Sequence, residues 1–308
     1  MKELKFIASD GKKLTCVLWD RVTRPVGVVQ IIHGMDEHVR RYDRFAKFLN
    51  RRGYIVFGDD HRAHGKSATS IAAIGTPDGD DDLFGATVMD ELEILKYLRG
   101  RFNLPVFLFG HSYGSFITQS VISQTSAHSG VCLSGSALYP RVALGIANMA
   151  AWLGEKIKSP DAPARFLEYF SPIRSKPGGP SRLTRDRAQA AAHARDPYRS
   201  RNFSYGFYHS LFHNLMTLRR RANPDIPMLI ISGSRDLVSM NARWARGLYN
   251  FYRRHGVEHI SLRIYPDARH ELLMELNYAD VQRDIVQFLD NARRNAGCIN
   301  RCEIHVQA

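Results

Sequence analysis

A serine set between two glycines could carry nucleophilic chemistry. Ser112 lies in a Gly-x-Ser-x-Gly pattern with Gly110 and Gly114, directly after the apolar run 106–109. The run predicts a buried strand and the residues that follow predict a helix, so the serine occupies a sharp turn between them. A side chain at either glycine would collide with a neighbouring strand or helix. The hydroxyl is then exposed at a helix N-terminus, and the N–H of Tyr113 is free to bind an oxyanion.

A serine hydroxyl is a poor nucleophile near neutral pH and needs a histidine base held by a carboxylate. Two loops supply candidates, each directly after a predicted strand. Asp236 follows the strand 227–231, and His270 follows the strand 260–265. The order serine, acid, histidine is the one expected for loops at the carboxyl ends of a parallel sheet. Asp267 is a competing acid, although its position three residues before the histidine would cramp the geometry.

An oxyanion requires two N–H donors. Tyr113 supplies one, and the loop after the strand 26–32 is expected to supply the other through Met35. Gly34 allows the backbone to turn so that the Met35 N–H faces the site. His33 is expected to brace this loop rather than to take part in the chemistry.

The elements that must position these residues follow an α/β pattern. An antiparallel hairpin opens the chain, and strands then alternate with helices up to about residue 136, which predicts a mostly parallel sheet with helices on both faces. No strong strand appears between residues 137 and 223, and alternation then returns. We therefore expect a catalytic domain formed by residues 1–136 and 224–308, with a helical lid inserted as residues 137–223. The predicted lid helices span 143–156, 183–195 and 203–221.

These motifs together give the chain a resemblance to a known family. It resembles α/β-hydrolases of the monoacylglycerol lipase and lysophospholipase group, the serine aminopeptidase-like hydrolases. The resemblance implies a Ser112–Asp236–His270 triad and an oxyanion hole formed by the N–H groups of Met35 and Tyr113. The motifs span most of the chain outside the lid: His33-Gly34-Met35-Asp36-Glu37-His38-x-x-Arg41-Tyr42, Asp60-His61-Arg62-Ala63-His64-Gly65-x-Ser67, Gly110-His111-Ser112-Tyr113-Gly114, Ser232-Gly233-x-x-Asp236 and Ala268-Arg269-His270-Glu271.

Three residues depart from the family pattern. Asp36 and Ala63 stand where relatives usually carry glycine, and Ser115 stands where a second glycine is common. The departure at Asp36 can tilt the loop after the strand 26–32, which carries the expected oxyanion donor Met35. The other two residues are small, and the fold should tolerate them.

The resemblance implies hydrolysis of a carboxylic ester with a lipid-like acyl chain, such as a monoacylglycerol or a lysophospholipid. The acyl group would pass to Ser112 and then to water. A peptidase, a small-ester carboxylesterase and a non-catalytic binding protein are the alternatives. Apolar lid residues suit an acyl tunnel or simple packing onto the catalytic domain: Leu144, Ile146, Met149, Trp152, Leu153, Phe166, Phe170, Phe207, Phe212 and Leu215.

The composition indicates which binding partners and which cellular location to expect. The net charge is +13, but the basic residues are scattered in pairs and triplets, which favours solvated faces, or attraction to an anionic membrane surface, over nucleic-acid binding. We expect a cytoplasmic protein, peripheral to membranes at most, because the sequence shows no long apolar run and no secretory signal. The oligomeric state is left open.

No cofactor or metal is expected. Four histidines in the loops after the first two parallel strands fit no familiar zinc spacing: His33, His38, His61 and His64. Cys298 and Cys302 show a CxxxC spacing near the end of the chain, but no second ligand pair accompanies them.

Overall fold

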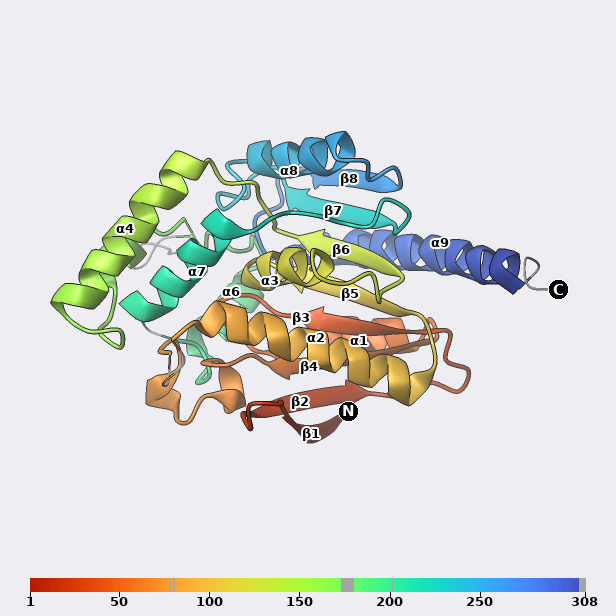
Figure 1. Ribbon diagram of the computed structural model, residues 1–308, viewed down its shortest axis with the longest axis horizontal. Coiled ribbons are helices and arrows are strands. Elements are labelled where there is room, and N and C mark those ends of the chain that lie inside the picture. Colours follow the sequence, from red (N-terminus) through yellow and green to blue (C-terminus); the bar gives the residue numbers. More distant parts are fainter. Residues whose placement is uncertain (78, 80, 173–179, 201, 305–308) are drawn as a thin grey trace.

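An eight-stranded sheet forms the centre of the molecule, in the order β1-β2-β4-β3-β5-β6-β7-β8 (Figure 1). The computed structural model describes residues 1–77, 79, 81–172, 180–200 and 202–304, with side chains up to residue 294. β2 runs antiparallel to β1 and β4, and every other pairing is parallel. The predicted mostly parallel sheet with an N-terminal hairpin is therefore confirmed.

The central strands are mostly apolar because helices cover both of their faces. Every residue of β3 to β7 is buried, whereas the edge strand β8 alternates between half-buried and exposed positions. The strands are β1 (Lys2–Ile7), β2 (Lys13–Trp19), β3 (Gly27–Ile32), β4 (Tyr54–Asp60), β5 (Val106–His111), β6 (Gly130–Ser134), β7 (Met228–Gly233) and β8 (Ile260–Tyr265).

Two apolar clusters, one on each face, hold the helices against the sheet. One cluster contains residues of α2, α3 and α8, and the other contains residues of α1 and α9. The helices are α1 (Asp43–Asn50), α2 (Leu83–Phe102), α3 (Tyr113–Ile122), α4 (Arg141–Ile157), α5 (Arg165–Tyr169), α6 (Arg187–Arg195), α7 (Tyr205–Thr217), α8 (Arg243–Arg254) and α9 (Tyr278–Ile304). Among the described residues, no helix is both long enough and apolar enough to cross a membrane.

The chain between β6 and β7 contains α4, α5, α6 and α7, and we call residues 137–223 the insertion. In Figure 1, α4 and α7 lie side by side beyond the carboxyl ends of the parallel strands, with α4 outermost. α6 begins at Arg187, four residues later than predicted, because the Asp186 side chain accepts hydrogen bonds from the N–H groups of Ala188 and Gln189 and caps the helix there.

Candidate active site

The turn at Ser112 has the strained geometry that the sequence predicts. Ser112 joins β5 to α3 with φ 50° and ψ −118°, outside the conformations that non-glycine residues usually adopt. A Cβ atom at Gly110 would lie 2.2 Å from Thr118 Oγ1, and one at Gly114 would lie 2.1 Å from the carbonyl oxygen of Ile32. Only glycine therefore fits on either side of the serine.

Three parallel strands bring Ser112, His270 and Asp236 together. The residues follow β5, β8 and β7 respectively, and parallel strands end at one edge of the sheet. His270 Nε2 lies 2.7 Å from Ser112 Oγ, and His270 Nδ1 lies 3.0 Å from Asp236 Oδ1. The Val238 N–H donates to the same carboxylate oxygen at 2.9 Å. The competing acid, Asp267, has a side chain that is 69% exposed and faces Arg235 instead.

The buried pair of His270 and Asp236 stabilises the charge of each partner. Burial disfavours an imidazolium, but the neighbouring Asp236 carboxylate outweighs it and raises the pKa of His270 above 6.5. Burial likewise opposes ionisation of Asp236, and the His270 ring lowers the pKa of that carboxyl below its usual value. His111, whose ring centroid lies 4.9 Å from that of His270, has its pKa lowered to about 4 by burial and by the positive charge of His270. His111 therefore stays neutral where His270 titrates.

We expect kcat/KM to rise with pH and to reach half its plateau above pH 6.5. A protonated His270 cannot accept the serine proton, so activity is lost below its raised pKa. The pH profile of ester hydrolysis measures this directly. His111→Gln is the control, because a group that is neutral above about pH 4 should leave the midpoint within a few tenths of a pH unit. A midpoint clearly below 6.5 would contradict the pairing of His270 with Asp236.

Two hydrogen bonds fix the backbone of the loop after β3, residues 33–38, which we call the oxyanion loop. His33 Nδ1 donates to the carbonyl oxygen of Gly34 at 2.8 Å, and the Gly34 N–H donates to Glu37 Oε1 at 2.6 Å. In a trans peptide the N–H points opposite to the carbonyl, so holding the Gly34 oxygen toward His33 turns the Met35 N–H the other way. Among the described residues, the N–H groups of Met35 and Tyr113 donate to no protein acceptor.

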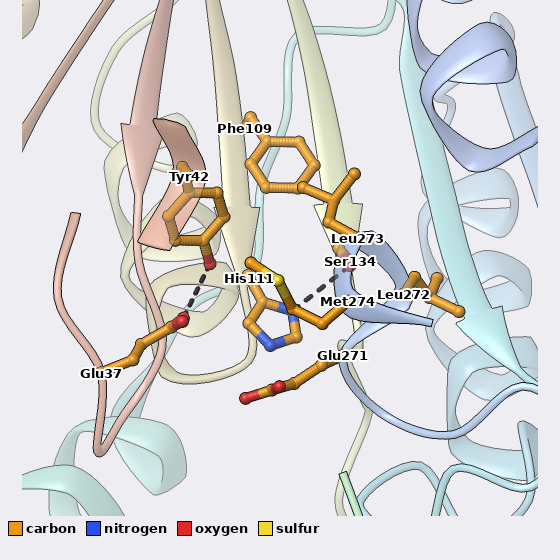
Figure 2. Close-up of a pocket in the computed structure, with 9 residues that line it drawn as sticks. All are labelled: Glu37, Tyr42, Phe109, His111, Ser134, Glu271, Leu272, Leu273 and Met274. Carbon is orange, nitrogen blue, oxygen red and sulfur yellow. Dashed lines mark hydrogen bonds between the residues drawn. The ribbon is translucent and has the colours of Figure 1, made fainter. Parts of the chain in front are cut away.

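A buried ion network behind this loop was not predicted. Arg41 donates to Glu37 Oε2 at 2.8 Å and binds both oxygens of Glu271 at 2.8 and 2.9 Å. Tyr42 donates to Glu37 at 2.7 Å, the contact drawn in Figure 2. The network therefore links the oxyanion loop to the residue after His270. All four residues lie inside the sequence motifs, but the motifs do not show that they meet.

A small pocket lies against this network (Figure 2). Neither Ser112 nor His270 lines it, although their chain neighbours His111 and Glu271 do. Its lining residues are Glu37, Tyr42, Phe109, His111, Ser134, Glu271, Leu272, Leu273 and Met274.

Replacing Arg41 with glutamine should lower the free energy of unfolding by about 3–5 kcal/mol, because two buried carboxylates then lose their cation. The Arg41 and Glu271 side chains are only 9% and 8% exposed, so solvent does not replace the lost partner. Denaturant titration measures the change. Arg283→Gln, in an exposed pair with Asp280 on α9, should change stability by less than about 0.5 kcal/mol. Equal effects in the two variants would contradict this prediction.

The three departures from the family pattern occupy distinct environments. Asp36 and Ala63 adopt φ 63° and 59°, so they keep the left-handed backbone that glycine favours. The Ser115 hydroxyl lies 2.6 Å from the Ser112 carbonyl oxygen and 2.9 Å from Ser136 Oγ. Ser115 therefore adds a polar contact directly beneath the nucleophile.

The loop histidines do not form one site. The rings of His33 and His61 stack with centroids 3.8 Å apart and His64 lies beside them, whereas His38 pairs with Asp196 at 2.8 Å. His61 Nδ1 lies 3.1 Å from carboxylate oxygens of both Asp59 and Glu91.

Asp59, His61 and Glu91 are the described residues whose ligand atoms lie close enough to hold a metal ion, within 4.8 Å of one another. Burial and the Asp59 charge raise the pKa of Glu91 to about 8, so a proton on Glu91 and an imidazolium at His61 can balance the buried charges. The side chains of Cys298 and Cys302 lie outside the described part of the chain.

The sheet order, the strained turn and the Ser–His–Asp array define an α/β-hydrolase. The family model described as serine aminopeptidase, S33 (Hydrolase_4) matches residues 23–277, and the chain belongs to this family.

Curated relatives and solved structures agree with this assignment. The monoglyceride lipase of Rattus norvegicus is 26% identical over 274 residues, covering 88% of this chain and 84% of that protein. A monoacylglycerol lipase of Mycolicibacterium smegmatis is 25% identical over 93% of this chain and 96% of its own length. A thermostable carboxyl esterase from Bacillus coagulans, solved with glycerol, has a TM-score of 0.82 and 25% identity over 95% of this chain and 98% of its own. The chain is thus a carboxylic ester hydrolase of the monoglyceride lipase group.

Proposed function

We propose that this enzyme hydrolyses carboxylic esters of lipid-like substrates, such as a monoacylglycerol or a lysophospholipid, through an acyl-enzyme on Ser112. The observation that carries the proposal is the continuous hydrogen-bonded array from Ser112 Oγ through His270 to Asp236, at 2.7 and 3.0 Å. This array is what acyl transfer to a serine requires.

The steps follow from the positions of the atoms. His270 Nε2 takes the Ser112 proton as Oγ attacks the ester carbonyl carbon, and Asp236 stabilises the imidazolium that forms. The N–H groups of Met35 and Tyr113 receive the oxyanion. His270 then returns the proton to the leaving alcohol, which departs and leaves the acyl group on Ser112. Water, deprotonated by His270, attacks the acyl carbonyl, and His270 returns that proton to Ser112 Oγ as the fatty acid is released.

The apolar residues of the insertion favour a substrate with a lipid-like acyl chain. On this proposal, the insertion acts as a lid. The structure divides its apolar residues into two groups. Leu144, Phe207 and Leu215 are buried against the rest of the protein, so they serve packing. Large apolar side chains of α4, α5 and the residue after α5 remain exposed: Val142, Ile146, Met149, Trp152, Leu153, Ile157, Phe166, Tyr169 and Phe170. An apolar surface of this kind beyond the strand ends suits an aggregated or membrane-borne substrate.

The net charge of +13 supports peripheral contact of the same surface with anionic membranes. Lys156 and Arg165 belong to the helices that carry the exposed apolar residues. Cosedimentation with phosphatidylserine vesicles that weakens as salt increases would support this contact. Equal binding to neutral vesicles would contradict its electrostatic part.

Hydrolysis of p-nitrophenyl esters from acetyl to palmitoyl tests the proposed function. We expect activity to peak at medium or long acyl chains and to vanish in Ser112→Ala. A peak at acetyl would favour a small-ester carboxylesterase instead. Aminoacyl p-nitroanilides form a parallel series, because hydrolysis of these amides in the absence of ester hydrolysis would favour the peptidase alternative.

A further inference from the structure

The insertion binds the oxyanion loop at Asp36, which follows the proposed donor Met35. His193, in the last turn of α6, donates from Nε2 to the backbone carbonyl oxygen of Asp36 at 2.9 Å. Arg199 donates to Asp36 Oδ2 from Nη2 at 2.8 Å and from Nε at 3.2 Å. We call Asp36, His193 and Arg199 the clamp. It joins residues more than 150 positions apart in the sequence.

A second contact lies beside the clamp. His38, two residues after Asp36, pairs with Asp196 at 2.8 Å between Nε2 and Oδ2. The side chains of His38 and Asp196 are mostly buried, so solvent screens the pair only partly. The segment 193–199 therefore contacts the oxyanion loop at two residues, Asp36 and His38.

The backbone of Asp36 adopts a strained conformation, which contacts from outside the loop can stabilise. Asp36 has φ 63°, a left-handed conformation that costs most non-glycine residues about 1 kcal/mol. A glycine would adopt this φ without strain, but it would carry no carboxylate for Arg199. Aspartate tolerates the conformation better than most side chains and supplies the anchor as well.

The other holds on this loop come from the catalytic domain. His33 fixes the Gly34 carbonyl, Glu37 fixes the Gly34 N–H, and Asp60 accepts from the Val39 N–H at 3.0 Å. These contacts set the two ends of the loop. The stretch between them, which contains the Met35–Asp36 peptide, is held at Asp36 by the insertion.

We propose that Asp36 is a positioning residue through which the insertion sets the aim of the Met35 N–H, so that the oxyanion hole is complete only while segment 193–199 is docked. The proposal rests on the proposed function, in which Met35 is an oxyanion donor. Removing a whole oxyanion donor lowers kcat by about 10²–10³-fold, so misaligning one should cost about tenfold.

Two variants that preserve the fold test the clamp. Asp36→Gly removes the carboxylate and relieves the left-handed strain, and Arg199→Gln removes the cation from a side chain that is 35% exposed. Each should lower kcat by about tenfold and change KM by less than about twofold, because the oxyanion forms only after the ground state. The double variant should lose little more than either single one, because both break the same contact. Arg195→Gln, an exposed position of α6, is the matched control and should leave kcat unchanged.

Hydrogen exchange provides a readout that does not depend on activity. Exchange of a peptide covering residues 33–38 should accelerate about tenfold in Asp36→Gly and Arg199→Gln but not in Arg195→Gln. Unchanged kcat and unchanged exchange in both variants would overturn the proposal, and so would an effect confined to KM. A wild-type protein that hydrolyses no ester would instead defeat the proposed function, and the exchange rates would still decide whether the clamp holds the loop.

Discussion

Replacing Ser112 with alanine is expected to lower kcat by about 10⁶-fold on any ester that the wild-type enzyme cleaves. The variant loses the oxygen that forms the acyl-enzyme, and no neighbouring hydroxyl can substitute for it. Ser115 Oγ is directed to the Ser112 and Ser136 oxygens, and Ser134 Oγ lies 3.3 Å from His111 Nδ1. What remains should be the modest stabilisation that binding and the oxyanion hole give to attack by water.

Steady-state kinetics and labelling by a fluorophosphonate, which reacts with activated serines, measure this loss. The folded state should not suffer, because alanine is smaller than serine and Ser112 contributes no side-chain cap to α3. Ser123→Ala, just beyond the end of α3, is the matched control and should retain wild-type kcat and labelling. Labelling of the Ser112→Ala protein at wild-type rate would show that another residue is the nucleophile.

Replacing Asp236 with asparagine is the second large effect, with an expected loss of about 10⁴-fold in kcat. The asparagine amide can donate to His270 Nδ1 and so favour the tautomer with its proton on Nε2. That tautomer cannot accept the proton of Ser112, 2.7 Å away. The loss of the carboxylate should also lower the pKa of His270 and move the rise of kcat/KM to lower pH.

Asp267→Asn separates the two candidate acids. Its side chain is 69% exposed and bonds to neither triad partner among the described contacts, so its kcat should stay within about twofold of wild type. Measuring both variants at several pH values distinguishes the loss of the general base from a shift in its pKa. Wild-type activity in Asp236→Asn, together with a large loss in Asp267→Asn, would reverse the assignment.

The spacing of strands and loops was enough to predict where the active-site side chains meet. Ser112, Asp236 and His270 each follow a strand of a parallel sheet, and the carboxyl ends of such strands lie at one edge. The prediction needed only the order of the elements. The glycines at 110 and 114 were equally predictable, because a sharp turn beside packed backbone leaves no room for a side chain.

Contacts between distant polar residues could not be predicted in this way. Arg41 meets Glu271 across 230 positions, and Asp36 meets Arg199 across 163. The sequence contains 43 lysine and arginine residues and 30 aspartate and glutamate residues, so charge alone allows very many pairings. Which of them form depends on how distant segments of the chain pack together, and no local periodicity records that. The start of α6 was also predicted wrongly, at Leu183 instead of Arg187. The true start is set by hydrogen bonds from the N–H groups of Ala188 and Gln189 to the Asp186 side chain.

The clamp has a consequence for recombination between relatives. The insertion leaves the sheet after β6 and returns before β7, so it could be transplanted between homologous hydrolases as one continuous cassette. Arg199 and His193 would travel with that cassette, but Asp36 would not, because it lies in the loop after β3. A chimera that combines this insertion with a host glycine at position 36 would lack the carboxylate for Arg199. A transplanted insertion should therefore keep the proposed aim of the Met35 N–H only if the host also carries aspartate at position 36.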